Sequence, residues 1–208
     1  MQRIAIAGTH TDIGKTIVAA VLAEALGADY WKPVQAGVLD NSDTMTVRSL
    51  VSENVFTHPE AVRLQMPASP HTAAAHDGIT IDFTQFSWPE TNKTLLVETA
   101  GGLLSPMNDH STMADFISHY HMPAFLVTRH YLGSINHTLL CMEVMKQRDI
   151  GLLALIVSGD RHESSERFIR SYTGVNNILH VPQLEGVSKE AAKAAAMLLK
   201  EQLNAIGL

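Results

Sequence analysis

The sequence predicts an α/β fold in which a doubly wound, mainly parallel sheet carries helices on both faces. Short apolar runs alternate with helical patterns along the 208 residues, as they do in chains of β-α-β units. Several of these runs are apolar throughout, which is typical of strands buried on both faces. A glycine-containing turn joins the first run to the first helical pattern. At this length the chain is expected to form one domain, residues 1–208.

The individual elements follow from the spacing of apolar residues. Strands are predicted at Ile4 to Ala7, Tyr30 to Val34, Thr94 to Val97, Ala124 to Thr128, Leu152 to Val157 and Ile178 to Val181. Helices are predicted over about residues 15–26, 43–53, 111–121, 134–147, 164–172 and 188–206. Prolines interrupt residues 55–90, where we expect loops and short helices. Ligands of open α/β sheets bind beyond the carboxyl ends of the strands, so these ends hold the candidate site residues.

Composition excludes several classes of protein. Hydrophobic residues make up 46% of the chain and charged residues 17%, which indicates a globular protein. The net charge of −6 argues against a broad nucleic-acid-binding surface. No apolar run approaches the roughly 20 residues that span a bilayer, and the N-terminus lacks the pattern of a signal peptide. With Cys141 as the one cysteine, an internal disulfide is excluded, so we expect a cytoplasmic protein.

The segment Gly8 to Thr16 is predicted to bind phosphate. It reads Gly-Thr-His-Thr-Asp-Ile-Gly-Lys-Thr and lies between the first strand and the first helix, so its N–H groups would face an anion at a helix N-terminus. Lys15 would reach the β- and γ-phosphates, and the Thr16 hydroxyl would bind Mg²⁺. Thr9 stands where the common motif has its first glycine. The alternative is an ordinary turn with Lys15 in solvent, but a helix N-terminus repels cations. The fold class is therefore P-loop NTPase-like.

Charged residues follow two further predicted strands. Lys32 lies among Tyr30-Trp31 and Pro33-Val34, which favours a buried lysine that neutralises an anion over a solvated one at a strand edge. Asp43 follows Asn41-Ser42 at a helix start, where it would either complete a Mg²⁺ shell or remain a solvated acid of the first turn.

Two glycine-containing segments end the central strands. Glu98 precedes Thr99, Ala100, Gly101 and Gly102, as a second metal-binding carboxylate near the γ-phosphate would, whereas a surface glutamate at a turn is the alternative. Gly133 and Ser134 open a helix whose free N–H groups would hold a carboxylate or simply be capped.

These segments, in this order, resemble the dethiobiotin synthase family from residue 4 to about residue 184. Gly8 to Thr16 is similar to that family's phosphate loop except at His10, Lys32-Pro33-Val34 to its catalytic-lysine motif, and Glu98 to the start of its glycine loop. Asn41-Ser42-Asp43, Ser69-Pro70-His71 and Leu132 to His137 match further segments. The resemblance implies an ATP-dependent cyclo-ligase of biotin biosynthesis, with Lys32 and Lys15 as catalytic residues.

In that family 7,8-diaminopelargonate takes up CO₂, from bicarbonate, as a carbamate that attacks the γ-phosphate of ATP, and the second amine then closes the ring as phosphate leaves. The resemblance implies that Mg²⁺ is held by Thr16, Asp43 and Glu98. It also implies a homodimer with composite sites, without nucleic acid or membrane as partner. The nucleotide would contact Thr11, Asp12, Ile13, Gly14, Lys15, Thr16, Ile17, Asp43, Glu98, Thr99, Ala100, Gly101, Gly159, Asp160, Pro182, Gln183 and Leu184, and the substrate Gln35, Ala36, Gly133, Ser134, Ile135 and Asn136.

Four positions depart from the family pattern. Ala36 replaces a hydroxyl residue that contacts the substrate, unless Gln35 supplies the hydrogen bond, and Thr99 restricts a loop that has glycine there. His10 would be either a neutral hydrogen-bonding group or a charge beside the phosphates. Gly159-Asp160 stands in place of Asn-Asp, and an aspartate accepts hydrogen bonds from guanine, which suggests an altered base preference.

Two other functions remain as alternatives. A switch ATPase of the ParA/MinD type would share the fold but act through a partner protein or a surface. His10 stands where such proteins carry an extra lysine, and no terminal amphipathic membrane helix is evident. A ligase related to cobyrinate amidation is the third reading, although 208 residues leave no room for a glutaminase domain.

Overall fold

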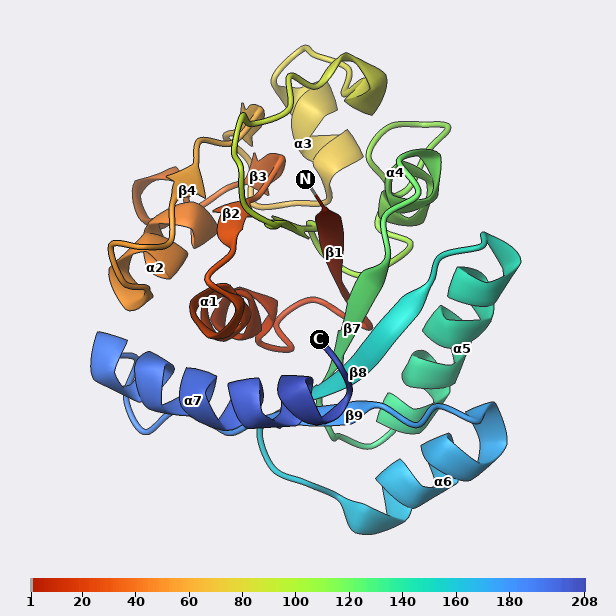
Figure 1. The fold of residues 1–208 in the computed structure, drawn as a ribbon. Helices are drawn as coiled ribbons and strands as arrows, with labels where there is room; N and C mark the ends of the chain where they lie inside the picture. The colour runs from red at the N-terminus through yellow and green to blue at the C-terminus, as the bar shows by residue number, and fades with distance from the viewer. Residues whose placement is uncertain (1) are drawn as a thin grey trace.

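The structure, a computed structural model, describes residues 2–208. These residues form a parallel sheet of seven strands with helices on both faces (Figure 1). The strands are β1 (Arg3–Gly8), β2 (Asp29–Trp31), β4 (Thr57–His58), β6 (Leu95–Glu98), β7 (Ala124–Thr128), β8 (Leu152–Ser158) and β9 (Ile178–Val181). Their order is β4-β2-β6-β1-β7-β8-β9, and every neighbouring pair runs parallel. The predicted fold class is confirmed.

The two faces of the sheet are covered by different helices. On one face lie α1 (Lys15–Leu26), α2 (Asp43–Leu50) and α7 (Lys189–Ala205), and on the other α3 (Pro70–His76), α4 (Met113–His119), α5 (Ser134–Gln147) and α6 (Glu163–Thr173). Alternate residues of β1 serve the two cores: Ile4 and Ile6 pack toward α1, whereas Ala5 and Ala7 pack toward α4. Burial on both faces explains why the strand is apolar throughout.

Element boundaries agree with the sequence prediction in most places, and the first difference is in the second predicted strand. The predicted strand Tyr30 to Val34 is divided, because Lys32 and Pro33 leave the sheet after β2 and the chain then forms β3 (Val34–Ala36). A proline has no N–H to donate to a ladder, and the Pro33 carbonyl accepts instead from Val62 N–H at 2.9 Å. β3 pairs with β5 (Val62–Leu64) in a separate sheet of two strands.

Residues 55–90 contain more regular structure than loops and short helices. Besides α3 and the 3₁₀ turn η2 (Phe83–Gln85), they supply β4 and β5, two strands too short to give an alternation pattern. A second 3₁₀ turn, η1 (Leu39–Asn41), leads into α2.

Two helices are shorter than the sequence predicts. The helix predicted at 43–53 ends at Leu50, and the helix predicted at 111–121 spans Met113–His119. Among residues 2–208, no helix combines the length and apolar character needed to cross a bilayer.

The topology brings segments far apart in the sequence to one edge of the sheet. β6 lies between β1 and β2, with Glu98 beside Ile6 in the register. The loop after β1, the turn after β2 and the loop after β6 therefore meet at the carboxyl ends of adjacent strands.

Candidate active site

The loop between β1 and α1 has the backbone of an anion-binding turn. Asp12 and Gly14 both adopt positive φ, 60° and 89°, and Gly14 is the N-cap of α1. This conformation turns successive N–H groups toward one side at the positive end of the helix dipole. Glycine is required there for its φ, and a Cβ on Gly14 would also lie 2.5 Å from Ser158 Oγ at the end of β8, so that hydroxyl would have to move.

Lys15 follows the inside of this loop. A Cβ on Gly8 would lie 2.8 Å from Lys15 Cδ, which shows how closely the lysine crosses the start of the loop. Lys15 Nζ donates to the His10 carbonyl at 3.4 Å. Burial lowers the pKa of Lys15 from its ordinary value, and the nearby charge of Glu98 only partly offsets the effect. A buried cation inside a ring of N–H groups is suited to a polyphosphate.

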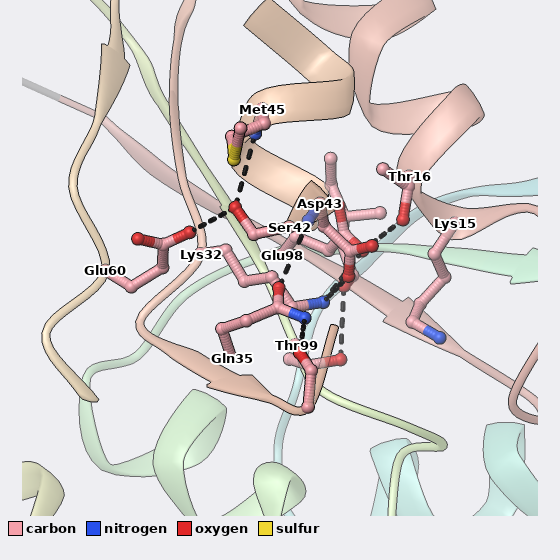
Figure 2. A network of polar contacts seen from close by, with 12 residues as sticks. Lys15, Thr16, Lys32, Gln35, Ser42, Asp43, Met45, Glu60, Glu98 and Thr99 are labelled. Carbon is pink, nitrogen blue, oxygen red and sulfur yellow. Dashed lines mark hydrogen bonds and ion pairs between the residues drawn. The ribbon is translucent and has the colours of Figure 1, made fainter. Parts of the chain in front are cut away.

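Lys32 occupies the floor of the site. Only 4% of the residue is exposed, and its Nζ forms ion pairs with Asp43 and with Glu98 Oε1, the latter at 3.2 Å (Figure 2). Burial by itself would lower the pKa of Lys32, but the charges of Glu98 and Asp43 outweigh it and hold the pKa above its ordinary value. Lys32 is therefore a fixed buried cation, which agrees with the burial predicted from its flanking residues.

Glu98 links the loop to the lysine. Its Oε1 accepts from Thr16 Oγ1 at 3.1 Å and from Lys32 Nζ, and its Oε2 accepts from the Tyr30 hydroxyl at 2.8 Å. Burial together with the charge of Glu98 raises the pKa of Tyr30 well above its ordinary value, so the phenol stays a donor. Sequence reasoning did not identify Tyr30, because an aromatic residue in an apolar run gives no sign of its hydroxyl's partner.

Asp43 is held at the start of α2. Ser42 caps this helix, with Oγ accepting from Met45 N–H at 3.4 Å and donating to Glu60 Oε1 at 2.8 Å. The Asp43 N–H donates to Gln35 Oε1 at 3.2 Å (Figure 2). Gln35 Nε2 in turn donates to the Gly37 carbonyl at 3.0 Å. Both ends of the Gln35 amide thus bind backbone, which leaves it less able to supply the substrate contact considered for it.

A cavity of about 800 Å³ opens over these groups. Most of the predicted site residues in the phosphate loop, between Lys32 and Asp43, and in the loop that begins at Glu98 line this cavity. They are Thr11, Asp12, Gly14, Lys15, Thr16, Ile17, Lys32, Gln35, Ala36, Asp43, Glu98, Ala100 and Gly101. Sequence reasoning gave no site role to Val38, Pro67, Ala68 and Ser105, nor to Asn41, Ser69 and Pro70 beyond a capping or family match. Two predicted residues of these same segments lie outside the lining: Ile13 packs in the core, and Thr99 is buried with Oγ1 donating to the Ile6 carbonyl at 3.2 Å.

Five residues predicted to contact the nucleotide lie apart from this cavity. Gly159 follows β8 and donates its N–H to Val181 O at 2.8 Å, beside Asp160 and the segment Pro182, Gln183, Leu184. Ser158 lies next to the phosphate loop, since its Oγ would be 2.5 Å from a Cβ added to Gly14. Arg129 donates to Gln183 Oε1 at 2.9 Å. These residues therefore form a separate surface beside the loop.

The four residues predicted at the helix after β7 also lie outside the cavity of their own chain. Gly133, at φ 100°, is the N-cap of α5, and Ser134, Ile135 and Asn136 form its first turn. The same region touches the phosphate loop, since the rings of His10 and His137 stack with centroids 6.2 Å apart. His10 Nδ1 also lies 2.6 Å from the Thr11 carbonyl.

Comparison with known proteins identifies the family. The family model described as an AAA domain matches residues 2–191. The curated protein "ATP-dependent dethiobiotin synthetase BioD" of Cytophaga hutchinsonii is 44% identical over 96% of this chain and 97% of its own length. The protein of the same name from Christiangramia forsetii is 50% identical over 79% of this chain and 80% of its own length.

Solved structures show the fold alone. The cell division ATPase MinD of Pyrococcus furiosus superposes with a TM-score of 0.60 at 16% identity, covering all of both chains. A plasmid partition protein of Borrelia burgdorferi, bound to AMPPNP, gives 0.61 at 11% identity over 99% of this chain and 97% of its own. The switch-ATPase alternative thus shares the architecture without close sequence similarity. On the sequence matches, the chain belongs to the ATP-dependent dethiobiotin synthetase family.

Proposed function

We propose that this protein carboxylates 7,8-diaminopelargonate with CO₂ and closes the ureido ring, with conversion of ATP to ADP and phosphate. The observation that carries the proposal is the buried Lys32, held by two carboxylates in the floor of the cavity that the phosphate loop borders. A carbamate and a γ-phosphate are both anions, and a fixed cation between them favours their approach. Family membership supplies the reaction class.

The chain's own residues have separate tasks in this proposal. Lys15 reaches the transferring phosphate from the loop, and Lys32 offsets charge on the carbamate oxygen that attacks it. Because the pKa of Lys32 is held high, Lys32 acts as a cation and hydrogen-bond donor, with no part as a base. A Lys32→Gln variant is therefore expected to lose turnover and to keep nucleotide affinity.

The residues present fit a Mg²⁺ ion. Thr16 Oγ1 lies 3.1 Å from Glu98 Oε1, and Asp43 shares Lys32 with that carboxylate, so three oxygen-bearing side chains meet beside the loop. Hydroxyl and carboxylate oxygens suit this hard cation, which takes its other ligands from phosphates and water. Bound there, Mg²⁺ would neutralise charge on the phosphate oxygens.

A homodimer would complete the site. The first turn of α5 has no side-chain cap and lies outside the cavity of its own chain, as expected if it binds the substrate carboxylate in the partner subunit. Leu132, just before this helix, and Leu140, on it, are strongly exposed and would be covered in a dimer. Analytical ultracentrifugation tests the assembly, and a monomer that turns over substrate would contradict it.

The base preference is open to a direct test. Gly159 and Asp160, with Pro182 to Leu184, are proposed to contact the base, and an aspartate accepts hydrogen bonds from guanine. We expect turnover with GTP or CTP as well as ATP. Kinetics with the three nucleotides measure this, and a strict preference for ATP would reject the altered preference while leaving the reaction itself intact.

The decisive assay is the dependence of phosphate release on its components. The proposal requires release to depend jointly on diaminopelargonate, bicarbonate and MgATP. Hydrolysis indifferent to the diamine, or stimulated only by a protein or lipid, would instead favour a switch ATPase.

A further inference from the structure

One wall of the cavity is poor in hydrogen-bonding groups. Gly37 packs so closely on the segment 67–70 that a Cβ there would lie 2.5 Å from Pro67. Residues 36–38 and 67–70 together form a mainly apolar wall of the cavity. Ser69 supplies a hydroxyl to this wall, whose other residues are Ala36, Val38, Pro67, Ala68 and Pro70. The amide of Gln35 is engaged with backbone at both ends.

Ser69 has an unusual position for its residue type. It is the N-cap of α3, which begins with Pro70, yet its side chain accepts no hydrogen bond from a backbone N–H of that helix. Its Oγ lies instead 3.0 Å from His71 Nδ1 and 3.1 Å from Thr72 Oγ1. The hydroxyl therefore borders the cavity with an imidazole directly behind it.

The proposed reaction needs an acceptor for protons. An amine that attacks a carbonyl carbon must lose a proton, and each of the two ring-forming nitrogens does so once. Lys32 lies in ion pairs with both Asp43 and Glu98, so these three charged groups are engaged with one another. An imidazole is the ordinary protein group that accepts a proton near neutral pH.

We propose that Ser69 and His71 act together as the proton acceptor for ring closure, an inference that rests on the proposed function. As the C–N bond forms and the bond from carbon to the phosphate oxygen breaks, phosphate leaves with the electron pair. The ammonium proton passes from nitrogen to Ser69 Oγ while the Ser69 proton passes to His71 Nδ1, and the imidazolium then releases it to water. Ser69 touches the substrate, and His71 is the residue that acts through it.

Charged groups on the elements packed against α3 have other partners. β3 carries none, and Arg63 of β5 bonds to Glu60 and to the Leu39 carbonyl. His76 and Asp77, at the far end of α3, pair with each other. The backbone N–H of His71 donates to the Pro106 carbonyl at 3.3 Å, which fixes the start of α3 against the loop that contains Pro106. Among these neighbours, the Ser69 hydroxyl is the route from the imidazole to the cavity.

Single-turnover kinetics of Ser69→Ala, His71→Asn and His71→Ala test the pair. Asparagine keeps a hydrogen-bonding group near the Nδ1 position but accepts no proton. We expect all three variants to lose about 100-fold in the rate of diamine-dependent ring closure, the lower range of general-base effects, with nucleotide affinity unchanged. Imidazole added to His71→Ala should restore part of the rate. His76→Asn, the same change at the far end of α3, serves as the control and should keep the wild-type rate.

The outcomes separate the two proposals. If wild-type phosphate release requires the diamine but His71→Asn turns over like wild type, the proton pair is wrong and the reaction stands. His71 would be only a structural support under a different outcome: His71→Ala loses rate that added imidazole fails to restore, whereas His71→Asn keeps the wild-type rate. Release that is indifferent to the diamine in the wild type would overturn both proposals. The thermal unfolding temperature of each variant shows whether misfolding causes a loss of rate. Ser69→Ala should remain folded, because Ser69 contributes no side-chain cap to α3.

Discussion

Removing the Tyr30 hydroxyl should weaken both the stability of the protein and the order of its site. Tyr30 is fully buried, and its hydroxyl donates to Glu98 Oε2 at 2.8 Å. In Tyr30→Phe the ring remains, but one oxygen of a buried carboxylate loses its donor. The opposite oxygen keeps its contacts with Thr16 and Lys32. The substitution therefore isolates a single charge-assisted hydrogen bond.

The size of the effect follows from the chemistry of that bond. A hydrogen bond to a charged group contributes about 1.5–3 kcal/mol, and a buried acceptor left alone keeps its desolvation cost. In a protein of this size each kcal/mol changes Tm by about 2–4 °C, so Tm should fall by about 3–12 °C. Turnover should fall as well, because Glu98 would gain freedom to rotate away from Thr16 and Lys32.

The difference between wild type and variant should shrink at high pH. Burial and the charge of Glu98 raise the pKa of Tyr30 in the folded state. Such a group contributes stability that is fully present below the ordinary tyrosine pKa of about 10, and this stability is lost as pH rises above it, where the unfolded chain ionises. Phenylalanine has no such proton to lose.

Urea unfolding at pH 7 and at pH 10.5 or above, about half a unit past the tyrosine pKa, measures both effects. Tyr172→Phe is the matched control, since Tyr172 is 66% exposed on α6 and its loss of a hydroxyl should change the free energy of unfolding very little. If Tyr30→Phe unfolds at the same urea concentration as the control, the hydrogen bond to Glu98 does not stabilise the fold and this reasoning is refuted.

Three further predictions concern the same framework. Lys32→Gln should abolish diamine-dependent phosphate release with nucleotide affinity kept, as measured by nucleotide titration; loss of nucleotide binding alone would mean that the role of Lys32 is misplaced. Gly14→Ala should abolish nucleotide binding and cost about 1–3 kcal/mol of stability in chemical denaturation, because φ is 89° and the new Cβ would meet Ser158 Oγ at 2.5 Å. Burial by itself would raise the pKa of Glu166, but hydrogen bonds from His180 and others hold it below its ordinary value. Its contribution to stability should be present above about pH 4.5 and be lost in more acidic solution, and Glu166→Gln should remove this part of the acid dependence in urea unfolding against pH.

Much of the site could be predicted from the sequence, because chemistry-bearing residues interrupt apolar strands. The burial of Lys32 followed from its apolar neighbours, and the phosphate loop followed from its place between a strand and a helix. The end of β2 did not, since the exit of Lys32 and Pro33 from the sheet depends on pairing with Val62 on a strand too short to recognise. The hydroxyl partner of Tyr30 is likewise set by tertiary contact, which no local pattern records.

The strand order carries the chemistry more than any single motif does. In sequence, Glu98 follows the phosphate loop and Lys32 by a long stretch of chain, yet β6 lies between β1 and β2 in the sheet. Glu98 can therefore contact Thr16 of α1 on one side and both Tyr30 and Lys32 of the β2 segment on the other. Had β6 been placed at an edge, the loop and the lysine would lack a common acid. The site thus depends on a long-range strand insertion, and a substitution that weakens the seating of β6 should separate Lys32 from the loop even though it leaves both motifs unchanged.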